Sequence, residues 1–261
     1  MTEDDYSVVA GYYDEAYASK EALQDVPFYV ELAKDKGGPM LEIGCGTGRV
    51  LLPTAREGIA IDGLDFSPVM LNVLEKHLSN ESPEVSDKVT LHQGDMRDFN
   101  LNKKYKLATI PFRPMQHMFT LDDQLAALKS AKNHLAPDGS LVFDVFFPLF
   151  SAMNIGDGKE HLDLEWISKE NPDQIIKRYF IKDSFDKINQ HFTGRLIFRT
   201  YENEKLVKEV SENLKMNFYT YQHLRLLFRM SGLEVVAEYG AFDKSPLDEN
   251  ASEMIFELRA G

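Results

Sequence analysis

The sequence has few of the features that place a protein in a membrane or outside the cell. Its 261 residues include a single cysteine, Cys45, which excludes an internal disulfide. Its longest apolar run, LVFDVFFPLF, is interrupted by Asp144 and Pro148, whereas a membrane span needs roughly 20 apolar residues. The opening residues, MTEDDYS, lack the basic start and the apolar stretch of a secretory signal. We therefore expect a protein of the reducing cytoplasm.

The sequence also has fewer positively charged than negatively charged residues. The chain carries 29 Lys and Arg residues against 42 Asp and Glu residues, which gives a formal net charge of −13. A surface with this charge balance repels phosphate backbones and anionic membranes on average. The seven histidines show no close ligand spacing such as HxxxH. We therefore expect no nucleic acid, membrane or metal ion as a partner.

The composition is otherwise that of a folded protein with a large core. Apolar residues make up 43% of the chain, which is enough for one large domain or for one domain with an insertion. As far as residue 147, short apolar runs alternate with amphipathic stretches. The runs are MLEI, IAIDGLD, VTLHQGD, LATIPF and SLVFDVFF. This alternation predicts a doubly wound α/β sheet with helices on both faces.

The pattern changes near residue 151. Charged segments with period-two alternation predict antiparallel strands between residues 162 and 218. An amphipathic helix and two further strands then complete the chain. We therefore predict a domain formed by residues 1–150 and 219–261, of which residues 1–36 form an N-terminal helical lid. Residues 151–218 form an antiparallel β insertion that is expected to cap the substrate site.

A glycine-rich segment, LEIGCGTGR, follows the first predicted strand. It places Gly44, Gly46 and Gly48 at the first turn of a doubly wound sheet, where ligands bind. A dinucleotide fingerprint reads GxGxxG, but Arg49 stands where its third glycine belongs. The spacing disfavours a nicotinamide cofactor, although the glycines still let a ligand approach the backbone closely. A tight turn without a ligand is the alternative.

Acidic residues follow the next two predicted strands. Asp65 ends the second strand, where a carboxylate can accept hydrogen bonds from both hydroxyls of a ribose. Asp95 and Met96 follow the third strand, where a carboxylate and a backbone N–H can bind an adenine ring. Each acid alone could be a helix cap or a solvated loop residue. Their order after successive strands favours a nucleoside-binding edge.

At this point the chain resembles the class I S-adenosylmethionine-dependent methyltransferases. The matching segments are LEIGCGTGR, GLDFSPVML, HQGDMRDF and NHLAPDGSLVFDVF, and the similarity extends over essentially the whole chain. The resemblance implies a seven-stranded Rossmann-like methyltransferase sheet and S-adenosylmethionine as the cofactor. It also implies a set of cofactor-binding residues: Glu42, Gly44, Cys45, Gly46, Gly48, Asp65, Phe66, Met70, Asp95, Met96 and Ile110.

The resemblance assigns roles within this set. The three glycines would contact the methionine part of the cofactor, Asp65 the ribose, and Asp95 with Met96 the adenine. Phe66 and Met70 would form apolar walls of the adenine pocket, or else pack in the core of the second helix.

Among these enzymes, the chain is similar to small-molecule N-methyltransferases of the glycine N-methyltransferase and amino-sugar N,N-dimethyltransferase kind. The shared features are the tyrosine-rich opening YSVVAGYYDEAY, the run HQGDMRDF and an insertion after the fifth strand. The segment IPFRPMQHM lacks the Asn-Pro-Pro-Tyr type of tetrapeptide that marks amino-methylating DNA enzymes. The resemblance therefore implies a small-molecule acceptor.

Methyl transfer is an in-line displacement, so the enzyme mainly positions the nucleophile and excludes water. The candidate catalytic residues are Tyr13 and Tyr17 in the N-terminal segment and His117 after the fourth strand. Alternatively, the tyrosines are packing residues of a lid and His117 is a capped loop histidine. Arg113 and Gln116 lie in the same loop as His117 and could hold a polar or acidic substrate.

We therefore expect an enzyme that transfers a methyl group from S-adenosylmethionine to a small molecule, with an amine nitrogen as the acceptor. An O-methyltransferase of a small metabolite and a catalytically silent, cofactor-binding regulatory module are the alternatives. The small-molecule substrate is the expected partner, and the β insertion could join two chains as a homodimer.

Overall fold

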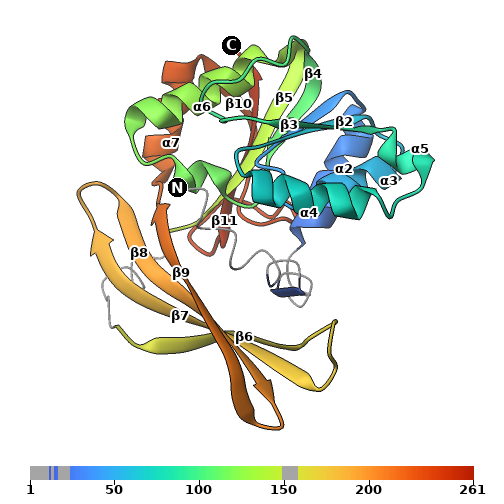
Figure 1. Ribbon diagram of the computed structural model, residues 1–261. Helices are drawn as coiled ribbons and strands as arrows, with labels where there is room; N and C mark the ends of the chain where they lie inside the picture. The colour runs from blue at the N-terminus through green and yellow to red at the C-terminus, as the bar shows by residue number, and fades with distance from the viewer. Residues whose placement is uncertain (1–11, 13–14, 17–23, 149–157) are drawn as a thin grey trace. The chain divides into compact units, whose positions relative to one another are not determined.

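A computed structural model describes Tyr12, Glu15, Ala16 and residues 24–148 and 158–261. The chain divides into two compact units by the contacts within each (Figure 1). The sheet unit comprises Gln24–Pro148 and Phe218–Gly261. The insertion unit comprises Met1–Leu23 and Leu149–Asn217.

The sheet unit is built on a seven-stranded sheet with the order β10-β11-β5-β4-β1-β2-β3 (Figure 1). Strands β1 to β5 run parallel, whereas β11 pairs antiparallel with both β5 and β10. The strands are β1 Met40–Ile43, β2 Ile61–Asp65, β3 Val89–Gln93, β4 Tyr105–Ile110, β5 Leu135–Phe146, β10 Leu233–Tyr239 and β11 Glu253–Ala260. The strand order reverses between β1 and β4, which is where doubly wound sheets bind ligands.

Helices cover both faces of this sheet (Figure 1). One face packs against α2 (Asp25–Lys36), α3 (Leu51–Arg56) and α4 (Pro68–Leu78). The other packs against α6 (Leu121–Asn133) and α7 (Tyr221–Ser231). The short helix α5 (Pro83–Ser86) and the 3-10 helix η1 (Pro114–His117) lie in connections. The buried apolar side chains accordingly form one cluster on each face.

Short polar side chains cap the starts of α4 and α6. Ser67 caps α4 by accepting a hydrogen bond from the Met70 N–H, and a proline occupies the first helical position. Thr120 caps α6 by accepting from the Asp123 N–H at 3.1 Å. Because α4 follows β2 directly, its cap fixes the backbone immediately after Asp65.

The insertion unit is a four-stranded antiparallel sheet with the order β6-β7-β8-β9. Its strands are β6 Glu160–Ile167, β7 Gln174–Asp186, β8 His191–Glu202 and β9 Lys205–Asn217. One face carries a small buried cluster in which the Tyr12 ring stacks on Phe198, with ring centroids 5.1 Å apart. Trp166, Ile176 and Ala16 complete that cluster.

The carboxylate of Glu15 ties the N-terminal residues to this sheet. Its oxygens accept hydrogen bonds from Trp166 Nε1 at 2.9 Å and from the Lys169 N–H at 3.1 Å. Tyr12 Oη lies 3.3 Å from Thr200 Oγ1 on the same sheet. The described residues of the N-terminal segment therefore pack within the insertion unit.

The predicted fold class is confirmed, since a doubly wound seven-stranded sheet is accompanied by an antiparallel β sheet in the interval where the period-two pattern occurs. The residues expected to form a lid, 1–36, divide between the units. Helix α2 belongs to the sheet unit, where Phe28, Tyr29 and Leu32 are buried in the core. Among the described residues, no helix is long and apolar enough to span a membrane.

Candidate active site

The carboxyl ends of the parallel strands bring the predicted site residues to one edge of the sheet, which we call the carboxyl edge. The glycine loop follows β1, Asp65 ends β2, and Asp95 follows β3. The loop that carries His117 follows β4. Because β4, β1, β2 and β3 are neighbours in the sheet, these four loops line one continuous edge.

The N–H groups of the glycine loop are already bonded within the protein. Those of Gly44 and Cys45 donate to the carbonyl of Leu64, and that of Gly48 donates to the carbonyl of Cys45. The Gly46 N–H donates to Asp65 Oδ2 at 2.7 Å. A phosphate-binding loop offers such N–H groups to its ligand. This loop therefore suits a ligand that approaches closely but carries no phosphate, in agreement with the spacing argument against a dinucleotide.

The three glycines meet different surroundings. All have positive φ, at 75° for Gly44, 53° for Gly46 and 89° for Gly48. A Cβ at Gly44 would meet Pro114 at 2.6 Å, and a Cβ at Gly48 would meet Leu74 at 2.3 Å. No described atom lies within 4 Å of a Cβ built at Gly46. Gly44 and Gly48 are thus required by packing, whereas Gly46 borders open space that a ligand can use.

Asp65 joins the end of β2 to the glycine loop. Besides the bond from Gly46, its Oδ1 accepts from the Ser67 N–H at 2.8 Å. Burial raises the pKa of Asp65, while the backbone N–H bonds act in the opposite direction. Each oxygen keeps acceptor capacity for a further donor, such as a hydroxyl. The neighbouring Phe66 ring is 46% exposed, which leaves an aromatic surface beside the carboxylate, whereas Met70 is buried at the base of α4.

Asp95 is held by an arginine two residues away. Arg97 Nε lies 3.0 Å from both carboxylate oxygens, and the Arg97 guanidinium also donates to Asp123 at the start of α6. The Arg97 hydrogen bonds lower the pKa of Asp95. Met96 is partly buried against the larger core cluster. Asp95 is therefore an oriented, ionised acceptor at the carboxyl edge.

Three buried carboxylates lie on the face of the sheet that α2 covers. Glu42 on β1, Asp144 on β5 and Glu253 on β11 are 2%, 1% and 7% exposed. Each has one oxygen without a hydrogen-bond partner among the described residues, namely Glu42 Oε2, Asp144 Oδ2 and Glu253 Oε2. Burial raises the pKa of all three. Buried acceptors of this kind are costly to leave unpaired.

The sequence predicted only Glu42 of this set. The others are part of a network with α2, in which the Tyr29 hydroxyl donates to Asp144 Oδ1 at 2.7 Å. Asp25, fully buried at the start of α2, forms a two-bond ion pair with Arg49. The available sequence signal was a charged residue inside an otherwise apolar strand, LVFDVF. Such a residue is buried only when it has partners.

The loop after β4 begins from a buried strand end. Ile110 is fully buried, so a ligand could reach it only through its backbone. The next non-proline residues, Phe112 and Arg113, both have positive φ, at 60° and 76°. The Phe112 N–H donates to Asp144 Oδ1 at 2.9 Å. The Arg113 guanidinium donates to Glu253 Oε1 at 2.6 Å.

His117 ends the 3-10 helix η1 that follows this loop. Its Nδ1 is buried and has no hydrogen-bond partner among the described residues. Burial lowers the pKa of His117 to about 4, so the imidazole is neutral near pH 7. A neutral imidazole with this low pKa can hydrogen-bond to a ligand and orient it, but it is a weak base. Gln116, expected to contact substrate, is fully buried, and its Oε1 accepts from the Phe146 N–H.

The remaining predicted site residues divide as follows. Tyr13 and Tyr17 lie outside the described residues, so their proposed catalytic role stays a prediction. Cys45 is buried, and burial raises the pKa of its thiol, which makes it unreactive. No group of His, Cys, Asp and Glu side chains suited to a metal ion occurs in the part of the chain that the structure describes.

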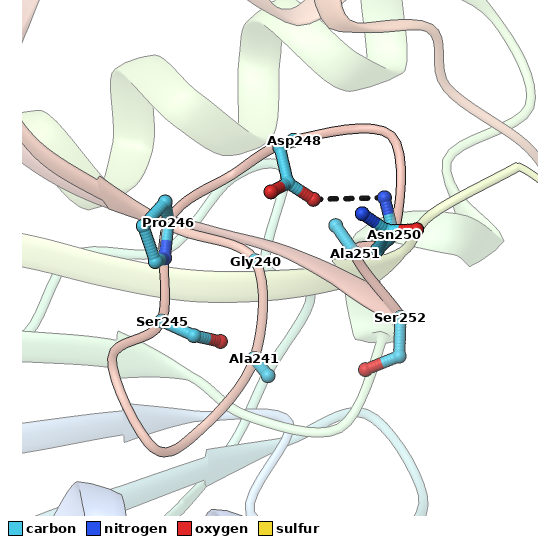
Figure 2. Close-up of a pocket in the computed structure, with 8 residues that line it drawn as sticks. All are labelled: Gly240, Ala241, Ser245, Pro246, Asp248, Asn250, Ala251 and Ser252. Atoms are coloured by element: carbon cyan, nitrogen blue, oxygen red, sulfur yellow. Dashed lines mark hydrogen bonds between the residues drawn. The ribbon is translucent and has the colours of Figure 1, made fainter.

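The β10–β11 connection encloses a pocket next to the start of β11 (Figure 2). It is lined by Gly240, Ala241, Ser245, Pro246, Asp248, Asn250, Ala251 and Ser252. Its carboxylate, Asp248, accepts a bond from the Asn250 N–H at 2.8 Å and so shapes the turn (Figure 2). The Gly240 carbonyl accepts from the N–H groups of Ser252 and Glu253. This connection therefore fixes the backbone at Glu253.

Comparison of the sequence with known families gives a match to the methyltransferase domain family over residues 40–139. Two curated relatives are similar over part of the chain. The dTDP-3-amino-3,4,6-trideoxy-alpha-D-glucopyranose N,N-dimethyltransferase of Streptomyces venezuelae is 32% identical over 120 residues, 46% of this chain and 47% of the relative. The dTDP-3-amino-3,6-dideoxy-alpha-D-glucopyranose N,N-dimethyltransferase of Streptomyces fradiae is 30% identical over 146 residues, 54% of each chain. The matched part thus spans about half of these relatives.

Comparison with solved structures extends the likeness to the whole chain. The CcbJ methyltransferase from Streptomyces caelestis matches with a TM-score of 0.83 at 20% sequence identity and covers 100% of both chains. At this identity, the match establishes a shared fold.

Proposed function

We propose that this chain is a class I S-adenosylmethionine-dependent methyltransferase that transfers the cofactor's methyl group to an amine nitrogen of a small, sugar-like acceptor. The observation that carries the proposal is the carboxyl edge, where the glycine loop, Asp65 and the buried Glu42 meet at the switch point of the sheet. The amino-sugar N,N-dimethyltransferases among its relatives support an amine as the acceptor.

The residues at this edge fit the cofactor. Gly46 borders open space, Asp65 keeps acceptor capacity for ribose hydroxyls, and the exposed Phe66 ring can pack on the adenine. Asp95 would accept from the adenine amino group, and Glu42 Oε2 from the ammonium of the methionine part. When bound, S-adenosylmethionine supplies an electrophilic methyl group on a positively charged sulfur.

Glu42 also suits a cationic ligand group. Its Oε2 is buried and has no hydrogen-bond partner among the described residues, and burial raises its pKa. A cation placed beside it would favour the ionised carboxylate, and their attraction would be weakly screened because water is largely excluded.

The acceptor nitrogen must carry a lone pair when it attacks. We propose that His117 orients the neutral amine, because its lowered pKa leaves an uncharged ring nitrogen free to exchange hydrogen bonds. Tyr13 and Tyr17 remain candidates for hydroxyl contacts to the cofactor or the acceptor. The insertion unit, residues 151–218 in the sequence prediction, remains a candidate cap of the acceptor site.

A turnover assay with matched acceptors tests the proposed function. The purified chain is incubated with S-adenosylmethionine and pairs of sugars that differ only by an amino or a hydroxyl group at one carbon, each free and nucleotide-linked. Mass spectrometry is expected to find methylation of the amino member alone. Methylation of the hydroxyl member would support an O-methyltransferase, and cofactor binding without any product would support the regulatory module.

We further propose that the protein acts in the cytoplasm as a homodimer joined through the insertion unit. Ile167, Ile175, Tyr201 and Leu206 are successive cross-strand neighbours, and the three aliphatic members are 63%, 40% and 51% exposed. A row of exposed apolar side chains is a common feature of an interface. Sedimentation should give a dimer for the natural chain and a monomer for Ile167→Glu. A monomeric natural chain would contradict this proposal.

A further inference from the structure

Two adjacent residues after β4 hold a backbone conformation that their side chains disfavour. Phe112 has φ of 60° and Arg113 has φ of 76°, and neither is a glycine. A left-handed conformation is sterically unfavourable for a residue with a Cβ. The two residues directly precede η1, which carries Gln116 and His117. Strain of this kind persists only where the surroundings impose it.

Two buried carboxylates impose it here. Asp144 Oδ1, on β5, accepts from the Phe112 N–H at 2.9 Å and from the Tyr29 hydroxyl at 2.7 Å. Glu253 Oε1, at the start of β11, accepts from the Arg113 guanidinium at 2.6 Å. Phe112 is therefore tied to β5, the neighbour of β4, and Arg113 to β11, the next strand in the sheet.

The supports of these two carboxylates are themselves fixed. Tyr29, which donates to Asp144, is a residue of α2, and its side chain is fully buried. The backbone of Glu253 is held by the Gly240 carbonyl, which closes the β10–β11 connection. The Arg113 guanidinium lies 5.5 Å from the centre of the Phe146 ring, which restricts it from a second side.

Fold stability alone is a poor explanation for this arrangement. Both carboxylates are buried, and each leaves one oxygen unpartnered among the described residues. Buried charges are stabilising only when their geometry and hydrogen bonding offset the loss of hydration, and apolar residues of similar volume often serve a core better. The buried carboxylates therefore lower the stability of the fold while they fix the conformation of one loop.

We propose that Asp144 and Glu253 are positioning residues for methyl transfer, which hold Phe112 and Arg113 in the left-handed conformation that presents η1 and His117 to the acceptor. The inference rests on the proposed function, because it needs an acceptor at this loop. Neither carboxylate touches the reacting atoms, so their loss should lower the rate of the bound complex and leave cofactor binding intact.

Steady-state kinetics and cofactor binding provide the first test. Asp144→Ala removes the acceptor of the Phe112 N–H, and kcat is expected to fall on the order of 10- to 100-fold. The Kd of S-adenosylhomocysteine should stay within about twofold. Asp144→Asn keeps a carbonyl oxygen in place and should retain most of kcat. Equal loss of kcat in both variants would overturn the proposal.

Relief of backbone strain provides a sharper test. In the Asp144→Ala background, Phe112→Gly lets the loop adopt positive φ without the steric cost, so kcat should recover several-fold. The matched control is Asn102→Gly in the same background, because Asn102 also has positive φ, at 50°, but precedes β4 at the opposite edge of the sheet. The control should give no recovery. Equal recovery in both, or in neither, would overturn the proposal.

Hydrogen exchange separates this inference from the proposed function. If the natural chain methylates no amine, the proposed function fails, and the exchange rate of the Phe112 N–H then tests the positioning. Protection of that amide in the natural chain and in Asp144→Asn, but not in Asp144→Ala, supports it. Equal exchange in all three overturns it.

Should Asp144→Ala fail to fold, Glu253→Ala replaces it in the kinetic comparison, with the same two glycine substitutions.

Discussion

The carboxylate of Asp65 accepts a 2.7 Å hydrogen bond from the backbone N–H of Gly46, so the end of β2 is joined to the glycine loop that follows β1. Asp65 is the last residue of β2, and Gly46 lies in the loop after the parallel neighbour β1, 19 positions away in the sequence. The bond shapes the loop and orients the acid at once. A ligand that contacts both residues therefore meets a surface that is formed before it binds.

Replacement of this acid should weaken cofactor binding. Asp65→Ala removes an acceptor for the ribose hydroxyls and one support of the loop, so the affinity for S-adenosylhomocysteine should fall by about 1 to 3 kcal/mol. Isothermal titration calorimetry measures the change. The control is Asp87→Ala, an exposed acid after α5, which should bind normally. Undiminished affinity in Asp65→Ala would contradict the ribose assignment.

Alanine at two glycines of the loop should separate binding from stability. Gly46→Ala meets no described atom within 4 Å, so it should cost only the strain of positive φ, about 1 to 2 kcal/mol, while the methyl group obstructs the cofactor. Gly48→Ala places its Cβ 2.3 Å from Leu74, so it should lose more stability, about 2 to 4 kcal/mol. Chemical denaturation and calorimetry measure the two effects. Normal cofactor affinity in Gly46→Ala would show that the open space is not the cofactor site.

The stability contributed by Glu253 should depend on pH. Burial raises the pKa of Glu253 to about 7. The positive charge of Arg113 opposes this shift, and the negative charges of Asp144 and Asp25 reinforce it. The folded chain binds this proton more tightly than the unfolded chain. The free energy of unfolding due to this group therefore falls as pH rises from the usual pKa of 4.5 to about 7, and is constant above that.

Glu253→Gln should remove this dependence. Relative to the natural chain, the variant should gain about 3 kcal/mol between pH near 4.5 and pH near 8. Denaturant titrations at the two pH values measure the difference. A difference that does not change with pH would show that Glu253 titrates normally and is not the buried carboxylate described here.

Much of the fold, and the placement of the glycine loop and Asp65 at the carboxyl edge, could be predicted because the signals are local. Ser67 and Pro68 mark the start of α4 within two adjacent residues, and the glycine loop lies beside the strand that it ends. The resemblance to class I methyltransferases is confirmed by the family match over residues 40–139 and by relatives of that activity. Such features depend on neighbours in the sequence, so the sequence alone reports them.

The network behind the edge could not be predicted because its partners are distant. Arg113 and Glu253 are separated by 140 positions, and Tyr29 and Asp144 by 115. Positive φ at Phe112 leaves no composition signal, since glycine is the residue expected there. The depressed pKa of His117 likewise depends on burial, which the loop sequence does not reveal. An acid in a buried strand, Asp144, was the one available sign.

The tie between Glu15 and Trp166 should be visible by fluorescence. Trp166 is the single tryptophan of the chain and is 8% exposed. Glu15→Ala removes the acceptor of its indole N–H, so the ring should become more solvated and its emission should shift to longer wavelength. Glu204→Ala, an exposed acid in the β8–β9 turn, is the control. An unchanged spectrum in Glu15→Ala would mean that the N-terminal residues do not pack on this sheet in solution.

The central claim, methyl transfer to an amine nitrogen, is tested most directly by the position of the transferred group. The chain is supplied with S-adenosylmethionine labelled with a heavy isotope in its methyl group and with an amino sugar, and the product is analysed by nuclear magnetic resonance. The account predicts that the label is bonded to nitrogen, as one or two methyl groups. Label bonded to oxygen or carbon, or retained entirely on the bound cofactor, would contradict it.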